Sequence, residues 1–451
     1  MKRIITAILI GLCVAMAMPL DVQAGRNGKA DRRERARKEV VANGRGYYKD
    51  VFMNGGINLS SRRTLPSTRS LGLTLEYFAT APTAKMTKKD TLLQKQIFAG
   101  YYDDTNGPLL YPDGEPRFRM VYFNGGGAAR HGASLTVDGR TTMRQYLANG
   151  GSYVGSCAGA FIASKGAISS KDLSIAHVDC YLNLWPGTTR STGLSDSRTA
   201  MTIEKRSPLL RYFDFGGDMV VDSIYHNNGC YVYNEKNGIV PAGTVALSRY
   251  IFEDTDKVHI NGRVGTWGYK HNEQSGRVVV TGSHPEGITK GERLDYMAAM
   301  VLYALDGNGE AQVKGELENG EVREMNKRTE DNDPAHTRIG DRQYHHFVVN
   351  IPKGCKRAVI SLDGYKGEDK FDLTLCAKRG EMAYHDNTSH QVVSLGCKKS
   401  LAIDNPKAGE WYVSVFCETT VTATEGEYGT EYSGRIDVLN GVPYSIKVEC
   451  E

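Results

Sequence analysis

The chain has 451 residues, of which 40% are hydrophobic and 24% are charged, and its formal net charge is +4. This length is enough for two or three domains with buried cores. Nucleic-acid-binding proteins concentrate basic residues to neutralise phosphates, and a net charge this small argues against a nucleic-acid partner. We therefore expect a folded protein with more than one domain and a different kind of partner.

The first 24 residues have the features of a secretory signal peptide. Lys2 and Arg3 precede an apolar run over residues 4–18, and Val22-Gln23-Ala24 is a small-residue cleavage sequence. The apolar run is too short to span a bilayer. The sequence thus predicts an exported protein, secreted or periplasmic, without a membrane span. The basic residues that follow predict a flexible segment over residues 25–46.

A first domain is expected over residues 47–306, where predicted strands and helices alternate. The expected strands are 47–53, 117–123, 152–156 and 278–280, and the expected helices are 67–78, 141–149 and 294–305. Such alternation indicates an α/β fold with a doubly wound parallel sheet. Ligands of such sheets bind at the C-terminal ends of the strands.

The pattern Gly155-Ser156-Cys157-Ala158-Gly159 follows the expected strand 152–156. It is the thiol version of a nucleophile elbow, a sharp turn between a strand and a helix that needs small neighbours. The N-terminus of the following helix would favour the thiolate, which is the reactive form of cysteine. We interpret Cys157 as a nucleophile, although a buried structural cysteine is the alternative.

Three glycines, Gly125, Gly126 and Gly127, follow the expected strand 117–123. Their backbone N–H groups could point at a developing oxyanion, together with the N–H of Ala158. The alternative is an ordinary tight turn.

A histidine and a carboxylate follow the β-branched run Val278–Val280. His284 would take the thiol proton and later protonate the leaving amine. Glu286 would accept a hydrogen bond from the other ring nitrogen and so orient the imidazole.

A polar segment, His226-Asn227-Asn228, lies between the two motifs. It is a candidate for substrate contacts, but we favour a hairpin turn at Asn228-Gly229.

The cysteine elbow and Ser283-His284-Pro285-Glu286 resemble the class I glutamine amidotransferase-like superfamily. Within it, the elbow and the Phe-Asn-Gly-Gly-Gly turn at residues 123–127 are similar to the biotin–protein ligase N-terminal-like family. The resemblance covers roughly residues 47–305. It implies a flavodoxin-like sheet, hydrolysis of amide bonds, and the roles given above for Cys157, His284 and Glu286. The elbow also resembles cyanophycinase-like serine peptidases, with cysteine in place of serine.

The remainder of the chain has a different pattern. Residues 307–341 are charged and poor in large apolar side chains, which is typical of a linker. Short alternating segments over residues 342–451 then predict an all-β sandwich. Phe371–Leu375 and Pro406–Val413 are similar to the bacterial pre-peptidase C-terminal domain, which implies an accessory role beside an exported hydrolase.

The chain has nine cysteines, one of them in the expected signal peptide and five after residue 350. In an exported protein this distribution predicts disulfides in the C-terminal domain, with pairings that the sequence does not give. No His/Cys cluster has zinc spacing, so we expect no metal and no cofactor.

Together these features predict an exported cysteine hydrolase, amidase or peptidase-like, that cleaves a C–N amide bond of a peptide or small amide substrate. The alternatives are a non-catalytic exported binding protein on the same scaffold and a cyanophycinase-like peptidase variant. The oligomeric state is not predicted.

Overall fold

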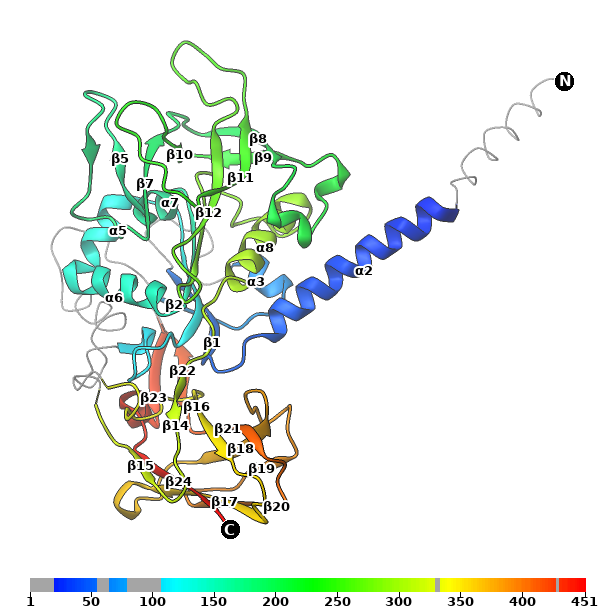
Figure 1. The fold of residues 1–451 in the computed structure, drawn as a ribbon. Helices are drawn as coiled ribbons and strands as arrows, with labels where there is room; N and C mark the ends of the chain where they lie inside the picture. Colours follow the sequence, from blue (N-terminus) through cyan, green and yellow to red (C-terminus); the bar gives the residue numbers. More distant parts are fainter. Residues whose placement is uncertain (1–19, 55–64, 79–106, 329–332, 427–429) are drawn as a thin grey trace, which may run out of the picture.

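The computed structural model describes residues 20–54, 65–78, 107–328, 333–426 and 430–451. Most of the expected signal peptide lies outside these residues. The described chain forms an α/β unit and, beneath it in Figure 1, a C-terminal unit of strands. None of the helices in the described ranges combines the length and apolarity that a bilayer crossing requires.

A nine-stranded mixed sheet forms the centre of the α/β unit, in the order β2-β1-β3-β4-β13-β12-β11-β8-β9. Its strands are β1 (Lys49–Asn54), β2 (Leu75–Phe78), β3 (Phe118–Phe123), β4 (Ser152–Ser156), β8 (Ser197–Ile203), β9 (Val220–His226), β11 (Val245–Ile251), β12 (Val264–Lys270) and β13 (Arg277–Thr281). The part from β2 to β13 is parallel, and β12, β11, β8 and β9 extend it with antiparallel pairs. The sheet is therefore mixed, whereas the sequence predicted a parallel one.

Helices cover both faces of the sheet (Figure 1). One face carries α2 (Leu20–Ala42), α3 (Pro66–Ser70) and α8 (Glu292–Leu305), and the other carries α5 (Ala128–Ser134), α6 (Thr136–Ala148) and α7 (Ala158–Ala163). Short 3₁₀ turns are η1 (Gly107–Leu109), η2 (Pro208–Arg211) and η3 (Phe215–Gly217). The small sheet β10-β7-β5-β6 comprises β5 (Ser164–Ile168), β6 (Ile175–Ala176), β7 (Trp185–Ser191) and β10 (Cys230–Val232).

Two local predictions in this unit are wrong. The expected helix 67–78 ends at α3, because Gly72 has a φ of +71° and Leu75–Phe78 then pairs with β1 as a strand. The expected flexible segment 25–46 is largely helical. Val40 of α2 is buried in the core, and Arg37 donates a 2.6 Å hydrogen bond to the carbonyl of Tyr212.

The C-terminal unit contains two larger sheets and a two-stranded ribbon, in the orders β14-β16-β21-β18-β19, β15-β24-β17-β20 and β22-β23. The strands are β14 (Val313–Glu316), β15 (Val322–Met325), β16 (Tyr344–Ile351), β17 (Arg357–Gly364), β18 (Leu373–Arg379), β19 (His390–Val392), β20 (Lys399–Asp404), β21 (Gly409–Cys417), β22 (Val421–Glu425), β23 (Thr430–Gly434) and β24 (Tyr444–Cys450), with 3₁₀ turns η5 (Tyr365–Gly367) and η6 (Ile436–Asn440). Alternating apolar residues of both larger sheets share one core.

The expected linker 307–341 is also wrong, because its strands β14 and β15 belong to the two larger sheets of this unit. Lys314 of β14 is 2% exposed and bonds Asp113 at 2.7 Å and Glu115 at 2.8 Å, both in the α/β unit. Asp341 forms a buried bidentate pair with Arg117, at 2.9 and 3.0 Å. The segment therefore ties the two units together.

The predicted disulfides are absent from the structure, in which the cysteines of the described residues are all free. Cys397 and Cys417 lie within hydrogen-bonding distance of nearby backbone carbonyls instead of each other. Cys355 and Cys450 differ, because their thiols are in hydrogen-bonding contact.

Candidate functional site

The turn at Cys157 has the geometry that the elbow motif predicts. Cys157 lies between β4 and α7 with φ 49° and ψ −103°, a conformation that a non-glycine residue rarely adopts. A Cβ atom at Gly155 would lie 2.6 Å from the carbonyl of Gly159, and one at Gly159 would collide with the carbonyl of Phe123. Both positions need glycine, because helix α7 begins directly against the strands.

His284 reaches Cys157 from the neighbouring strand. β13 is parallel to β4, and Thr281 at its end pairs with Ser156. His284 follows three residues later, where its N–H donates a 2.9 Å hydrogen bond to the carbonyl of Tyr225 on β9. Nδ1 of its ring lies 2.8 Å from Oε1 of Glu286, and the ring is in hydrogen-bonding contact with the Cys157 thiol.

The surroundings of His284 favour its charged form. Burial by itself lowers the pKa of His284. Hydrogen bonds to Cys157 and Glu286, together with the negative charge of both groups, outweigh burial and raise this pKa to about 10. Glu286 is buried, so its interaction with the imidazole is weakly screened. The arrangement can hold a thiolate beside an imidazolium.

Buried hydroxyl groups support the end of β13. The Thr281 and Ser283 hydroxyls are 2.8 Å apart, and Thr266 on β12 donates to Thr281 at 2.9 Å. Because these groups satisfy each other inside the sheet, they fix the direction in which the chain leaves β13 toward His284.

The glycine turn after β3 lies against the same histidine. A Cβ atom at Gly125 would overlap the imidazole ring of His284, so only glycine leaves room for that ring. Gly126 and Gly127 line the pocket that contains Cys157. In the first turn of α7, the N–H groups of Ala160 and Phe161 donate to the carbonyl of Cys157. The N–H of Ala158, the candidate oxyanion donor, belongs to the same turn and directly follows Cys157 in the chain.

The Cys157 pocket has a volume of about 400 Å³ and is bounded by α5, α7, β7 and the loop after β9. Asn227 and Asn228 line it, and the carbonyl of Asn227 lies 3.9 Å from the Cys157 sulfur. His226 does not line it, because this residue is buried on β9 with Nε2 2.8 Å from the Thr199 hydroxyl. Burial, followed by the charge of His284, lowers the pKa of His226 to about 4.

The expected hairpin at Asn228-Gly229 is a tight turn of another kind. Both residues have positive φ, 68° and 92°. However, β9 and β10 on either side belong to different sheets, where they pair with β8 and β7. The turn therefore brings Asn227 and Asn228 into the lining of the pocket.

Three pocket residues carry no motif that sequence reasoning could use. Arg130 lies on α5, and His177 and Tyr181 stack with ring centroids 5.5 Å apart. They come from segments that only the fold brings to Cys157. The one available signal was that Arg130 follows the glycine turn by three residues.

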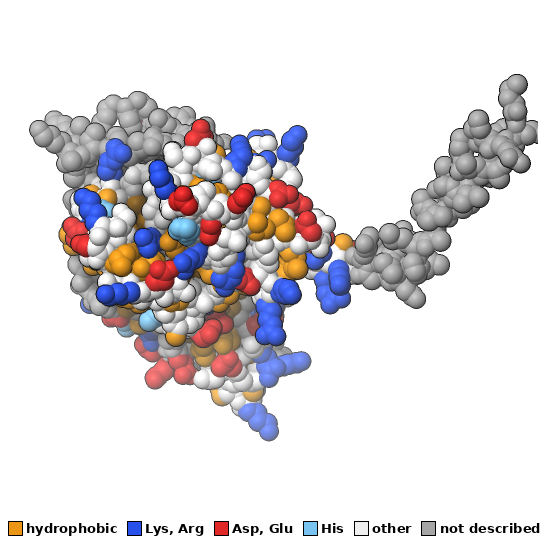
Figure 2. All heavy atoms as spheres, turned by 90° about the horizontal axis from the view of Figure 1, so that it is seen from above, with side chains coloured by type: hydrophobic (Ala, Val, Ile, Leu, Met, Phe, Trp, Pro, Cys, Tyr) orange, Lys and Arg blue, Asp and Glu red, His pale blue; other side chains and the backbone are white. Residues whose placement is uncertain are grey.

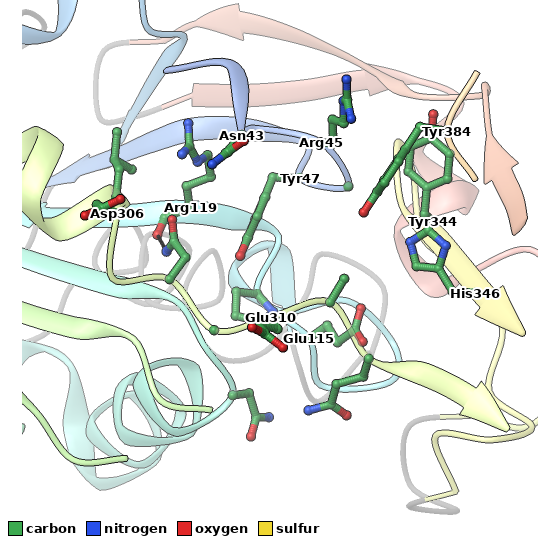
Figure 3. A pocket seen from close by; sticks show the side chains of 18 residues that line it. Asn43, Arg45, Tyr47, Glu115, Arg119, Asp306, Glu310, Tyr344, His346 and Tyr384 are labelled. Carbon is green, nitrogen blue, oxygen red and sulfur yellow. Dashed lines mark hydrogen bonds between the residues drawn. The ribbon is translucent and has the colours of Figure 1, made fainter. Parts of the chain in front are cut away.

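A second cavity of about 380 Å³ lies between the two units (Figure 3). Tyr47 and Arg119 of the α/β unit and Tyr344, His346 and Tyr384 of the C-terminal unit line it. None of the site residues predicted from the sequence borders this cavity. Among the described residues, no group of three or more His, Cys, Asp or Glu is placed to hold a metal ion.

One face of the molecule shows how charged side chains are distributed on it. Seen from above, the molecule exposes basic and acidic side chains intermixed, with small hydrophobic patches between them (Figure 2). Among the described residues visible on this face, basic and acidic side chains do not separate into large patches of one charge.

The candidate site lies within a part of the chain that matches a known protein family. Residues 115–300 match the family described as biotin-protein ligase, N terminal, and this range includes Cys157, His284 and the glycine turn. The predicted resemblance to that family is thus confirmed for this part of the chain. No curated protein matches the chain.

Two solved structures are similar at low levels. A ThuA-like protein from Bacteroides uniformis matches with a TM-score of 0.31 and 11% identity, over 58% of this chain and 95% of that one. Gan42B, a GH42 β-galactosidase from G. stearothermophilus, matches with a TM-score of 0.23 and 9% identity, over 67% of this chain and 32% of that one. At these TM-scores neither structure informs fold or function.

Proposed function

We propose that this protein is an exported cysteine hydrolase that cleaves C–N amide bonds through Cys157, His284 and Glu286. One observation carries the proposal. A cysteine on a strained turn contacts a histidine whose other ring nitrogen bonds a buried carboxylate. This combination of nucleophile, base and orienting acid is typical of covalent acyl transfer.

In the proposed reaction, the Cys157 thiolate attacks the amide carbonyl carbon and the carbonyl oxygen becomes an oxyanion. The N–H of Ala158 and those of the turn Gly125–Gly127 would stabilise this oxyanion. His284 gives its proton to the nitrogen of the leaving amine, the C–N bond breaks, and a thioester remains on Cys157. Neutral His284 then takes a proton from water, whose oxygen attacks the thioester, releasing the acid and regenerating the thiolate.

By bonding Nδ1, Glu286 would orient the imidazole of His284 and leave Nε2 for proton transfer with the thiol. The residues at positions 1–24 support export, and the two sheets of the C-terminal unit fit the proposed accessory sandwich beside a hydrolase. We also propose that the parallel part of the sheet is flavodoxin-like.

Selective alkylation tests the nucleophile without knowledge of the substrate. The purified protein is treated with iodoacetamide near neutral pH, and each cysteine is followed by peptide mass mapping. Cys157 should react fastest, ahead of the half-buried Cys180, whose pKa is raised by burial and by Asp179. Cys157→Ser should remove the fast phase, and the matched variant Cys180→Ser should keep it.

Hydrolysis of a library of peptides and simple amides then tests the reaction. Turnover that disappears in folded Cys157→Ser supports the hydrolase. Slow alkylation of Cys157, combined with tight binding of an amide that is never cleaved, would favour the non-catalytic binding protein instead.

A further inference from the structure

The charged side chains of the Cys157 pocket have one sign. Among the described residues that line it, none is an aspartate or a glutamate, and Arg130 is the permanent cation. A fixed positive charge without a carboxylate among the lining side chains favours an anionic group.

Arg130 lies directly over the glycine turn. A Cβ atom at Gly127 would lie 2.9 Å from Nε of Arg130, so the guanidinium folds back over the backbone of that turn. Other arginines of the same unit are paired, such as Arg249 with Glu204 and Arg211 with Asp306. Within the described part of the chain, the structure shows no carboxylate within ion-pair distance of Arg130, and its side chain is exposed.

The rest of the pocket offers a flat aromatic surface and neutral polar groups. His177 and Tyr181 stack at an interplanar angle of 24°, and Ser191 and Asn228 add a hydroxyl and an amide. None of these groups competes with a ligand carboxylate for the guanidinium. A planar guanidinium binds a carboxylate through two parallel hydrogen bonds, which fixes the orientation of the bound molecule.

We propose that the substrate is an amide that carries a carboxylate close to the scissile bond, and that Arg130 is the specificity-determining residue that binds this carboxylate. The proposal rests on the proposed function of Cys157 and adds the class of its substrate. Arg130 would position the amide carbonyl over the Cys157 sulfur, without taking part in proton transfer.

Two alkylating agents of nearly the same size test the proposal before any substrate is known. Iodoacetate carries a carboxylate where iodoacetamide carries a neutral amide, and both react with the same thiolate. In the purified protein, Arg130→Gln should lower the rate of Cys157 alkylation by iodoacetate about threefold to tenfold, as expected for one nearby charge. The rate with iodoacetamide should stay unchanged.

Two further variants make the result specific. Arg130→Lys keeps the charge and should retain most of the iodoacetate rate. Arg206→Gln removes an exposed arginine that does not line the pocket and should leave both rates as in the wild type. Thermal melting checks that each variant is folded.

The outcomes separate this proposal from the one on which it rests. If Cys157 reacts rapidly but the ratio of the two rates is the same in Arg130→Gln, the carboxylate-binding role is overturned and the hydrolase stands. An equal fall in both rates would make Arg130 a structural residue and also overturn the role. Failure of Cys157 to react faster than Cys180 removes both proposals.

Discussion

The two units of the molecule both bury cysteines, but in opposite surroundings. In the C-terminal unit, Cys376 lies within strand β18, where burial raises the pKa of its thiol to about 12. Burial also raises the pKa of Cys417. In the α/β unit, Cys157 lies on a turn at the end of a strand, faces a pocket and contacts His284. A buried thiol in a strand stays protonated, whereas one beside an imidazolium can ionise.

The comparison shows that reactivity depends on position in the fold, because both units supply cysteine and histidine. The imidazole of His346 in the C-terminal unit bonds the Ser414 hydroxyl at 2.7 Å, and burial lowers its pKa to about 3. His284 is also buried, yet a thiol and a carboxylate raise its pKa to about 10. The two side chains therefore differ in charge because of their partners: His346 is held neutral, as His226 is in the α/β unit, and His284 is held charged.

The largest expected effect is the loss of hydrolysis when Cys157 or His284, the reactive pair of the α/β unit, is replaced. Cys157→Ala should abolish hydrolysis, because the covalent route is lost. His284→Ala should lower the rate on the order of a hundredfold or more, since one group supplies base and acid. The double variant should be hardly slower than Cys157→Ala, because the two residues act as one unit. Initial rates on a cleaved amide measure this, and full activity in folded Cys157→Ala would contradict the mechanism.

The second prediction tests whether the two units are independent. Lys314→Met leaves the buried carboxylate of Asp113 and the half-buried one of Glu115 without their shared cation, and should lower the free energy of unfolding by about 3 kcal/mol. Urea unfolding measures the change. The matched control Lys447→Met breaks an exposed pair with Glu449 and should change it by about 0.5 kcal/mol or less. A negligible effect of Lys314→Met would mean that the buried network does not hold the units together.

The third prediction concerns the one thiol pair of the C-terminal unit. Cys355 and Cys450 are in contact, and burial together with this contact raises the pKa of Cys450 to about 11. Oxidised glutathione should convert them to a disulfide: one thiol forms a mixed disulfide and releases one glutathione, and the second thiol displaces the other. Closing this long loop should stabilise the protein by about 2 kcal/mol.

Peptide mapping without reductant identifies the bridge, and thermal melting before and after oxidation gives its effect. Cys355→Ser should prevent both changes, while Cys376→Ser should prevent neither. A bridge that includes Cys157 in active protein would contradict the assignment of the nucleophile.

The smallest expected effect is that of the orienting carboxylate. Glu286→Gln keeps a hydrogen-bond acceptor but removes the negative charge, so the maximal rate should fall about tenfold, less than in His284→Ala. Because Glu286 helps to raise the pKa of His284 to about 10, its loss should lower that pKa. The leaving amine then loses its proton donor sooner, and the alkaline limb of the pH–rate profile should move to lower pH. An unchanged alkaline limb would show that Glu286 does not set the charge of His284.

The sequence predicted the strands and helices that have strong local signals. The run Val278–Val280 is buried on β13, and the apolar residues from 294 to 305 form most of α8. The sequence of Leu75–Phe78 indicates a helix, but the segment is a strand, because its pairing with β1 involves residues distant in sequence. The sequence did not predict the antiparallel strands β12, β11, β8 and β9.

The sequence by itself determined the turn at Gly155 and Gly159, because a sharp turn restricts which residues can occupy it. It also predicted that Cys157 and His284 lie at the ends of strands. Which side chains complete the pocket was decided by tertiary structure: Arg130 and Tyr181 approach Cys157 from other elements, and His226 is turned into the sheet while Asn227 faces the sulfur. Likewise, residues 307–341 have the composition of a linker, yet Lys314 is buried because Asp113 and Glu115 neutralise it. Local sequence sets backbone conformation, but the burial of a charge depends on partners that only the folded chain supplies.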